Sequence, residues 1–302
     1  MFKSKNSMSR ALVRRETTAG YLFLLPSLFF FVTFVLYPMF LCIYTSFFDS
    51  NMGKNAVDVF VGLGNYTELF QDKLFLGALK NTVLIVVVAV PTVCAFSLWV
   101  ATAIYDMKPA LTSAFRCIFY LPVVTGSVAV TVVWKWMYNS RYGVFNYLFK
   151  SLGIIDQNIN WLGDARFALW CIILILFTTS VGQPIVLYVS ALGNVDHSLV
   201  EAAQVDGANR RQVFWKIKWA QIMPTTLYIL IITTINSFQC FALIQLLTSG
   251  GPTHSTDTIM YYIYYTAFKL YRYGYGNAMG VVLMIIIAVL SAVQFKLGQQ
   301  SD

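Results

Sequence analysis

Six long apolar stretches constrain the fold of this chain more than any other feature of its sequence. Each reaches or approaches the roughly 20 residues that an α-helix needs to cross about 30 Å of hydrocarbon, and none carries an Asp or Glu in its interior. They occupy approximately residues 20–48, 81–105, 115–138, 167–192, 225–249 and 277–295. Hydrophobic residues make up 58% of the chain and charged residues 11%, against about 45–50% and about 25% in soluble domains. The stretches therefore belong in a bilayer.

The pattern inside these stretches predicts helices rather than barrel strands. Strands of a membrane barrel alternate apolar and polar residues over about ten positions, whereas residues 82–90 are almost all apolar and do not alternate. A helix also satisfies its own backbone hydrogen bonds within the lipid. The sequence predicts an all-α membrane protein with six transmembrane helices.

Lysine and arginine residues predict the orientation. The tail at residues 1–19 is basic, and on the same side of an even-numbered bundle lie Lys108, the basic residues of 210–218, and Lys296. Because basic loops favour the cytoplasm, we expect a multi-pass protein of the cell (inner) membrane with both termini cytoplasmic. The predicted organisation is an N-terminal tail (1–19), a six-helix transmembrane domain (20–296) and a C-terminal tail (297–302).

The net charge of +8 is consistent with this topology. Basic residues near the membrane attract anionic lipid, and no basic patch is interleaved with aromatic residues outside the membrane zone. We expect membrane lipid, and no nucleic acid, among the partners.

Motifs for chemistry are absent. No Gly-x-x-x-x-Gly-Lys-Ser/Thr phosphate loop occurs, the five cysteines lie in apolar stretches without paired spacing, and His197 and His254 lie in loops on opposite sides of the membrane. We therefore predict no catalytic residue, no metal site and no cofactor in this chain. An ion-coupled secondary carrier and a membrane-embedded enzyme remain open as alternatives, although a coupled carrier usually keeps an ionisable group within its spans.

A polar segment joins the fourth and fifth stretches. Residues 198–201 read Ser-x-x-Glu, a capping box that starts a short helix, and Gly207 stands where a helix end needs positive φ. Asn209 and Gln212 suit the start of a second helix, and Pro224 is expected to close the segment. This pattern predicts a cytoplasmic helix-turn-helix, with an amphipathic surface loop as the alternative.

The same segment resembles the EAA loop of ABC importer permeases, especially the carbohydrate-uptake family. The residues that match in order and spacing are Glu201, Ala202, Ala203, Asp206, Gly207, Ala208 and Phe214. Further matches are Trp134-Lys135-Trp136, Trp161-Leu162 and Gly250-Gly251-Pro252. The resemblance implies a type I ABC importer permease (MetI-like) fold in which the loop at 193–224 carries the coupling helix.

The resemblance also implies partners and a function. The seven matched residues of the loop would couple the chain to a separate ATPase subunit. The complete transporter would hold a second homologous permease, two ATP-binding subunits carrying ATP and Mg²⁺, and an extracytoplasmic sugar-binding protein. This chain would form half of a pathway for a sugar substrate.

The predicted substrate pathway lies in the fifth stretch. In the maltose-type members of the family, the helix segment before the motif matched here by residues 243–248 lines the sugar site. The equivalent positions are Thr233, Asn236, Ser237 and Cys240, which share one helical face, or alternatively bond to neighbouring helices. Gly182 of the fourth stretch completes the set. One departure is that Phe177-Thr178 replaces a Trp-Lys pair common in the family.

Overall fold

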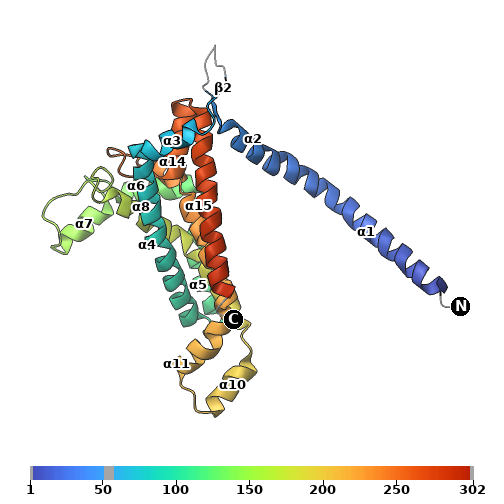
Figure 1. Cartoon of the computed structure of the whole chain (residues 1–302). Coiled ribbons are helices and arrows are strands. Elements are labelled where there is room, and N and C mark those ends of the chain that lie inside the picture. Colours follow the sequence, from blue (N-terminus) through green and yellow to red (C-terminus); the bar gives the residue numbers. More distant parts are fainter. Residues whose placement is uncertain (1–2, 51–57, 300–302) are drawn as a thin grey trace.

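The computed structural model describes residues 3–50 and 58–299, and its long elements are all helices (Figure 1). In chain order the elements are α1 (Lys3–Phe31), η1 (Val32–Leu36), α2 (Tyr37–Thr45), β1 (Phe48–Asp49), β2 (Val59–Phe60), α3 (Gly64–Gln71), α4 (Lys73–Ile104), α5 (Pro109–Val124), α6 (Ser127–Met137), α7 (Val144–Ser151), α8 (Ala168–Ser180), α9 (Gly182–Gly193), α10 (His197–Val205), α11 (Arg210–Val213), η2 (Phe214–Lys218), α12 (Trp219–Phe238), α13 (Ala242–Leu247), α14 (Ile259–Tyr264), η3 (Tyr265–Lys269) and α15 (Tyr273–Gln299). The η elements are short π-helical turns. β1 and β2 form a small antiparallel pair in which Phe48 faces Phe60.

Within the described residues, five helical runs are long and apolar enough to cross a membrane, and a sixth span exists if the pair α5 and α6 counts as one. The six-span prediction holds in this sense, but the third span is not one helix. α5 and α6 meet at 95° because Thr125 and Gly126 adopt extended backbone angles, with ψ values of 126° and 141°. The chain therefore turns sharply within the predicted third span.

The fifth span also differs from the prediction. Pro224 does not close the preceding segment, because it lies inside α12 and the helical run is continuous from Arg210. The helix then ends at Phe238, earlier than expected, and α13 begins only at Ala242. Cys240 consequently lies in a break between two helices, so the helical face predicted for the pathway residues stops at Ser237.

The bundle is centred on α4, which packs against α9 and α12, while α12 also packs against α15. Val93 of α4, Tyr188 of α9 and Ile229 of α12 are buried in the shared hydrophobic core. Ser97 of α4 donates a hydrogen bond to the carbonyl of Val181 (3.2 Å), at the junction of α8 and α9. α9 and α12 are thus held together by one central helix.

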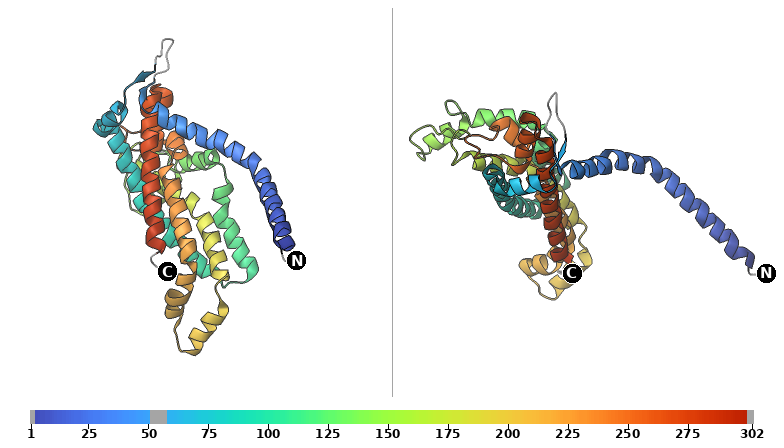
Figure 2. Two further views of the ribbon diagram at one scale, coloured as in Figure 1. Left: turned by 45° about the vertical axis from the view of Figure 1, so that its right-hand side comes forward. Right: turned by 45° about the horizontal axis from the view of Figure 1, so that its top comes forward.

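The first span stands apart from this bundle. α1 runs away from the other helices (Figures 1 and 2), and none of its most apolar window is buried. Only its continuation α2 packs against α15. The helix begins at Lys3 and the apolar span at Arg15, so the boundary expected after residue 19 falls inside a helix.

The end of the bundle opposite α10 and α11 is held together around Asp72 (Figure 1). Its carboxylate caps α4 by accepting from the Leu74 amide (2.8 Å) and also accepts from the hydroxyls of Tyr262 (2.7 Å) and Tyr275 (2.9 Å). Partial burial opposes ionisation, but these hydrogen bonds together hold the pKa of Asp72 below its usual value. α14 and α15 are thereby joined to the start of α4.

Candidate functional site

The polar segment forms a helical hairpin beyond one end of the bundle (Figure 1). Asp196 is the N-cap of α10, and its carboxylate accepts a hydrogen bond from the Ser198 amide at 2.9 Å. The expected capping box at Ser198 and Glu201 is therefore wrong by two positions. Asp196 has extended backbone angles suited to an N-cap, whereas Ser198 already lies within the helix.

The end of α10 follows the prediction. Gly207 has a φ of +83°, and the amides of Gly207 and Ala208 donate to the carbonyls of Gln204 (3.0 Å) and Ala203 (2.9 Å). This bonding closes a helix through a left-handed residue, which favours glycine. A Cβ added at Gly207 would meet nothing within 4 Å, so within this chain the requirement comes from the backbone alone.

The second helix of the hairpin also begins as predicted. Asn209 accepts from the Gln212 amide at 2.9 Å, and the Gln212 side chain accepts from the Asn209 amide at 2.8 Å. This reciprocal capping starts α11, which passes through the π-helical turn η2 directly into α12. The hairpin is thus covalently and helically continuous with the fifth span.

The two faces of α10 are different. Leu199, Ala202 and Val205 lie on the outer face, where Val205 is 88% exposed and Leu199 50% exposed. His197 and Gln204 lie on the inner face and line a cavity under the helix. The outer face carries small and apolar side chains that no other described part of the chain covers, which suits contact with another protein.

The predicted coupling residues fall into two groups. Some are exposed on the hairpin, namely Glu201, Ala202, Asp206 and Gly207, and others are half-buried, namely Ala203, Ala208 and Phe214. The exposed group extends from the middle of α10 to the turn that follows it. Of the half-buried group, Phe214 lines the cavity under α10.

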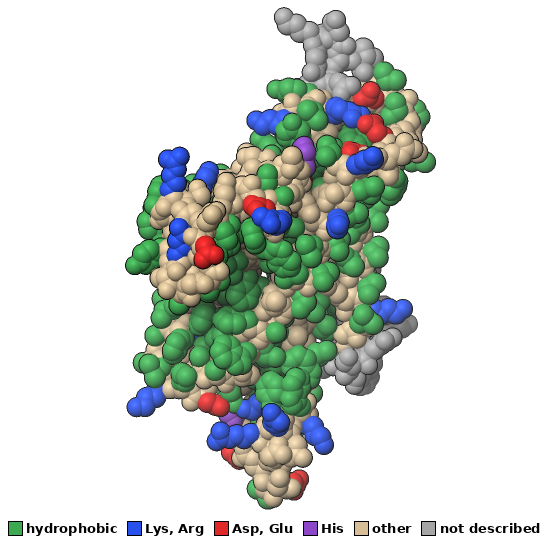
Figure 3. Space-filling view, turned by 90° about the vertical axis from the view of Figure 1, so that its left-hand side faces the viewer, with side chains coloured by type: hydrophobic (Ala, Val, Ile, Leu, Met, Phe, Trp, Pro, Cys, Tyr) green, Lys and Arg blue, Asp and Glu red, His purple; other side chains and the backbone are tan. Residues whose placement is uncertain are grey.

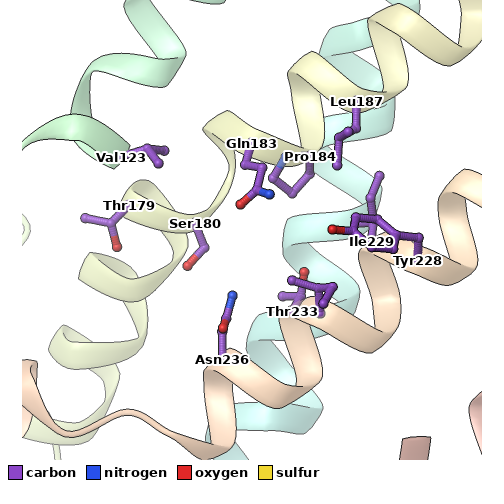
Figure 4. Close-up of a pocket in the computed structure, with 11 residues that line it drawn as sticks. Val123, Thr179, Ser180, Gln183, Pro184, Leu187, Tyr228, Ile229, Thr233 and Asn236 are labelled. Atoms are coloured by element: carbon purple, nitrogen blue, oxygen red, sulfur yellow. The ribbon is translucent and has the colours of Figure 1, made fainter. Parts of the chain in front are cut away.

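A polar cavity of about 160 Å³ lies within the membrane domain, between α5, the α8–α9 junction and α12 (Figure 4). Figure 4 shows Ser180, Gln183 and Asn236 directed into the same space. Its lining residues are Val123, Thr179, Ser180, Gln183, Pro184, Leu187, Tyr228, Ile229, Ile232, Thr233 and Asn236. None of them is Asp, Glu, Lys, Arg or His, so the cavity offers hydroxyl and amide groups without a full charge.

The predicted pathway residues are only partly brought together. Thr233 and Asn236 line this cavity, whereas Ser237 is 2% exposed and does not. Cys240 lines a neighbouring cavity of about 460 Å³ at the bend between α5 and α6. Gly182 is buried, and a Cβ there would lie 2.3 Å from the carbonyl oxygen of Phe119. Gly182 therefore lies where α5 and α9 cross at close range.

From the fourth span, sequence reasoning selected Gly182 and missed the polar residues beside it. Thr179, Ser180 and Gln183 bring three polar side chains to the cavity from the junction of α8 and α9. The sequence did contain a signal, because these polar residues interrupt an otherwise apolar stretch. Their spacing of i, i+1 and i+4 places Thr179 and Gln183 on one helical face. Tyr228 of α12 was missed as well.

Within residues 3–50 and 58–299, no group of three or more His, Cys, Asp or Glu residues is placed to hold a metal ion. The polar groups of the cavity are suited to hydrogen bonding rather than to proton or metal chemistry.

A helical bundle with an uncharged polar cavity, and an exposed hairpin on the helix that lines it, is an arrangement typical of a membrane transport subunit. The family of binding-protein-dependent transport system inner membrane components matches residues 73–299, and the chain belongs to that family. It is a multi-pass inner-membrane permease. The ion-coupled carrier and the membrane enzyme, left open by the sequence, have no support in this membership.

Individual relatives extend over nearly the whole chain. The lactose transport system permease protein LacF of Rhizobium radiobacter is 32% identical over 94% of this chain and 95% of its own length. The multiple sugar-binding transport system permease protein MsmF of Streptococcus mutans is 31% identical over 94% and 96%. In fold, the chain is similar to a subunit of a bacterial alginate ABC transporter, crystallised with an alginate pentasaccharide-bound periplasmic protein, at a TM-score of 0.80, 24% identity and 93% coverage of each chain.

Proposed function

We propose that this permease moves a sugar across the cell membrane in an ATP-driven, binding-protein-dependent importer. The observation that carries the proposal is the cavity of uncharged hydroxyl and amide groups between α8, α9 and α12. A neutral sugar presents many hydroxyls and no charge, so such a lining matches its hydrogen bonding without leaving a buried ion unpaired. The lactose and multiple-sugar permeases among its relatives support the same substrate class.

The energy source in this proposal is a separate subunit. The outer face of α10, with Leu199, Ala202 and Val205, docks onto an ATP-binding subunit, and ATP and Mg²⁺ bind there rather than in this chain. Two such subunits serve two permeases, and an extracytoplasmic binding protein delivers the sugar. Catalysis of ATP hydrolysis belongs to these partners.

A second homologous permease completes the pathway. The apolar span Arg15–Thr45 stands away from its own bundle with none of its most apolar window buried, and a neighbouring permease would cover one side of it while lipid covers the other. The cavity would then be closed by the facing helices of that neighbour.

Purification of the full-length tagged chain in mild detergent tests the assembly. We expect an ATP-binding subunit and a second permease to co-purify. Val205→Lys places a charge on the most exposed apolar side chain of α10 and should release the ATP-binding subunit, while Thr92→Ala, on the exposed surface of α4, should not. Equal recovery of that subunit with Val205→Lys would refute docking on this face.

Uptake measurements test the cavity. Asn236→Ala and Gln183→Ala each remove one amide, and the loss of one hydrogen bond of about 0.5–1.5 kcal/mol predicts about a 2- to 12-fold weaker apparent affinity for the sugar. Thr92→Ala again serves as control, because its hydroxyl bonds to the Val88 carbonyl of its own helix at 2.7 Å. Unchanged uptake in both cavity variants, with normal assembly, would remove this cavity from the pathway.

Cysteine labelling tests the orientation, with both termini proposed to be cytoplasmic. In a background lacking the five native cysteines, Asn6→Cys should react only after the membrane is permeabilised, and Asp164→Cys should react from outside. The reverse result would place α10 outside the cell and end its assignment as a coupling helix.

A further inference from the structure

A second cavity, of about 610 Å³, lies under α10 at the hairpin end of the bundle. It is bounded by the end of α4, the end of α9, the inner face of α10, and the helical run of α11 and η2. The lining residues are Thr102, Tyr105, Asp106, Leu192, Val195, His197, Val200, Gln204, Arg210, Val213, Phe214 and Lys218. It is separate from the polar cavity in the membrane domain, with which it shares no lining residue.

One part of the cavity wall is cationic. The Lys218 ammonium lies 4.4 Å from the centre of the Tyr105 ring and donates a hydrogen bond to the Tyr105 hydroxyl. Arg210 and His197 add a guanidinium and an imidazole, and Asp106 is the one acidic residue in the described lining. Among the described residues, neither Arg210 nor Lys218 has a carboxylate within 4.0 Å. Two cations therefore face the cavity without a directly paired carboxylate in the described part of the chain, and Asp106 offsets only part of their charge.

The rest of the wall is apolar. Leu192, Val195, Val200, Val213 and Phe214 come from α9, the loop after it, α10, α11 and η2, and form a hydrophobic lining beside the cations. A small inorganic anion would leave this apolar surface in contact with water. An amphipathic molecule with an anionic headgroup and an adjoining apolar part would cover both the cationic and the apolar parts of the wall.

The cavity also lies at the end of a candidate membrane span. α4, which is long and apolar enough to cross a membrane, ends at Ile104, directly before Tyr105 and Asp106 of the cavity wall. Figure 3 shows Lys and Arg side chains gathered around a histidine just below the band of hydrophobic side chains, at the hairpin end of the molecule. Cations at this level attract anionic lipids of the same leaflet.

We propose that this cavity binds an anionic phospholipid of the leaflet on the hairpin side. Arg210 and Lys218 hold the phosphate, and the apolar wall contacts the glycerol and the first acyl carbons. The lipid then contacts the inner face of α10 while the outer face of α10 remains free. Bound lipid stabilises the position of the hairpin by contacting the inner face of α10, and this role does not depend on which solute the permease carries.

Lipid retention tests the proposal without any transport assay. The full-length chain, with the subunits that co-purify, is placed in nanodiscs of equimolar phosphatidylglycerol and phosphatidylcholine, released into detergent, and its retained lipids are counted by native mass spectrometry. We expect the wild type to retain phosphatidylglycerol preferentially. Lys218→Gln and Arg210→Gln should each lower that preference about fivefold.

The same helical segment supplies matched controls. Lys216→Gln and Arg211→Gln remove the same charge from exposed positions that do not line the cavity, so the preference should persist in both. An equal loss in all four variants would overturn the proposal in favour of diffuse surface charge, and no loss in any would overturn it outright. Displacement of the bound lipid by inorganic phosphate alone would also overturn it, because the ligand would then be a soluble anion. Thermal unfolding midpoints of all variants show whether each is folded. If Lys218→Gln does not fold, Arg210→Gln, at an exposed position, still tests the proposal.

Discussion

Gly182→Ala should destabilise the permease through a clash between α5 and α9. Gly182 is the first residue of α9, and an added Cβ would lie 2.3 Å from the Phe119 carbonyl oxygen and 2.8 Å from Cγ2 of Val123. Even a close carbon–oxygen contact needs about 3.3 Å, so the two helices must separate by roughly 1 Å. Since the obstructing atom belongs to the backbone, a rotamer change cannot relieve the clash.

The expected cost is about 1–3 kcal/mol, the range measured when extra carbon atoms are forced into a packed interior. Thermal unfolding of the detergent-solubilised chain should show a midpoint several degrees below that of the wild type, since 1 kcal/mol corresponds to about 2–4 °C in large domains. Gly193→Ala is the matched control at the other end of α9, where an added Cβ meets nothing within 4 Å. It should leave the midpoint unchanged or raise it, because alanine favours helix over glycine by up to about 1 kcal/mol.

The two roles considered for Gly182 predict different results. A packing role predicts a lowered midpoint for Gly182→Ala, with reduced uptake following from reduced amount of folded protein. A direct role in the substrate pathway predicts lost uptake at an unchanged midpoint. A wild-type midpoint for Gly182→Ala would therefore refute the reasoning from the helix crossing.

Three further substitutions probe other parts of the molecule. Gly207→Val forces a β-branched residue into left-handed geometry at about 1–2 kcal/mol; uptake should fall while membrane abundance stays near normal, and uptake equal to wild type would argue against a coupling role. Asp72, with its pKa lowered, stabilises the fold above its unfolded pKa of about 3.9; the wild-type unfolding midpoint should drop as pH falls through the lower, folded pKa, and Asp72→Asn should lose both stability and this pH dependence. Asn146→Leu leaves the Ile159 amide and the Trp161 indole without their acceptor, at about 1–3 kcal/mol each if they stay buried; limited proteolysis should cut the loop after α7 faster, and an unchanged rate would contradict this.

The hairpin was predictable because its signals are local. Gly207 requires positive φ, and Asn209 and Gln212 cap each other within one turn, so neighbouring residues determine both features. The start of α10 was misplaced because Asp196 and Ser198 are both good N-cap residues, and the choice depends on how α9 ends. Gln221 of α12 accepts a hydrogen bond from the Asp196 amide at 3.1 Å, a tertiary contact that no local pattern contains.

The bends and breaks within the predicted spans were not predictable in the same way. Apolar content places residues 115–138 in the membrane but does not reveal the 95° turn at Thr125 and Gly126. Pro224 was expected to stop a helix, yet it lies inside one, as prolines in membrane helices often do because neighbouring groups satisfy the freed carbonyl. The shared face assumed for Cys240 required a helix that in fact ends at Phe238.

The continuity of the fifth span connects the two candidate functional regions through one helical run. The helical run from Arg210 to Phe238 carries Phe214 in the hairpin and Asn236 in the polar cavity, and at 1.5 Å per residue these two positions lie roughly 33 Å apart along one axis. Ser180 and Gln183, which face Asn236 across the cavity, belong instead to α8 and α9. We expect a tilt of this helical run to move Asn236 relative to Ser180 and Gln183, because those two residues lie on other helices. Because α12 ends at Phe238 and α13 begins only at Ala242, we expect this end of the helix to shift with less displacement of α13, so that the geometry of the cavity would follow the position of α10.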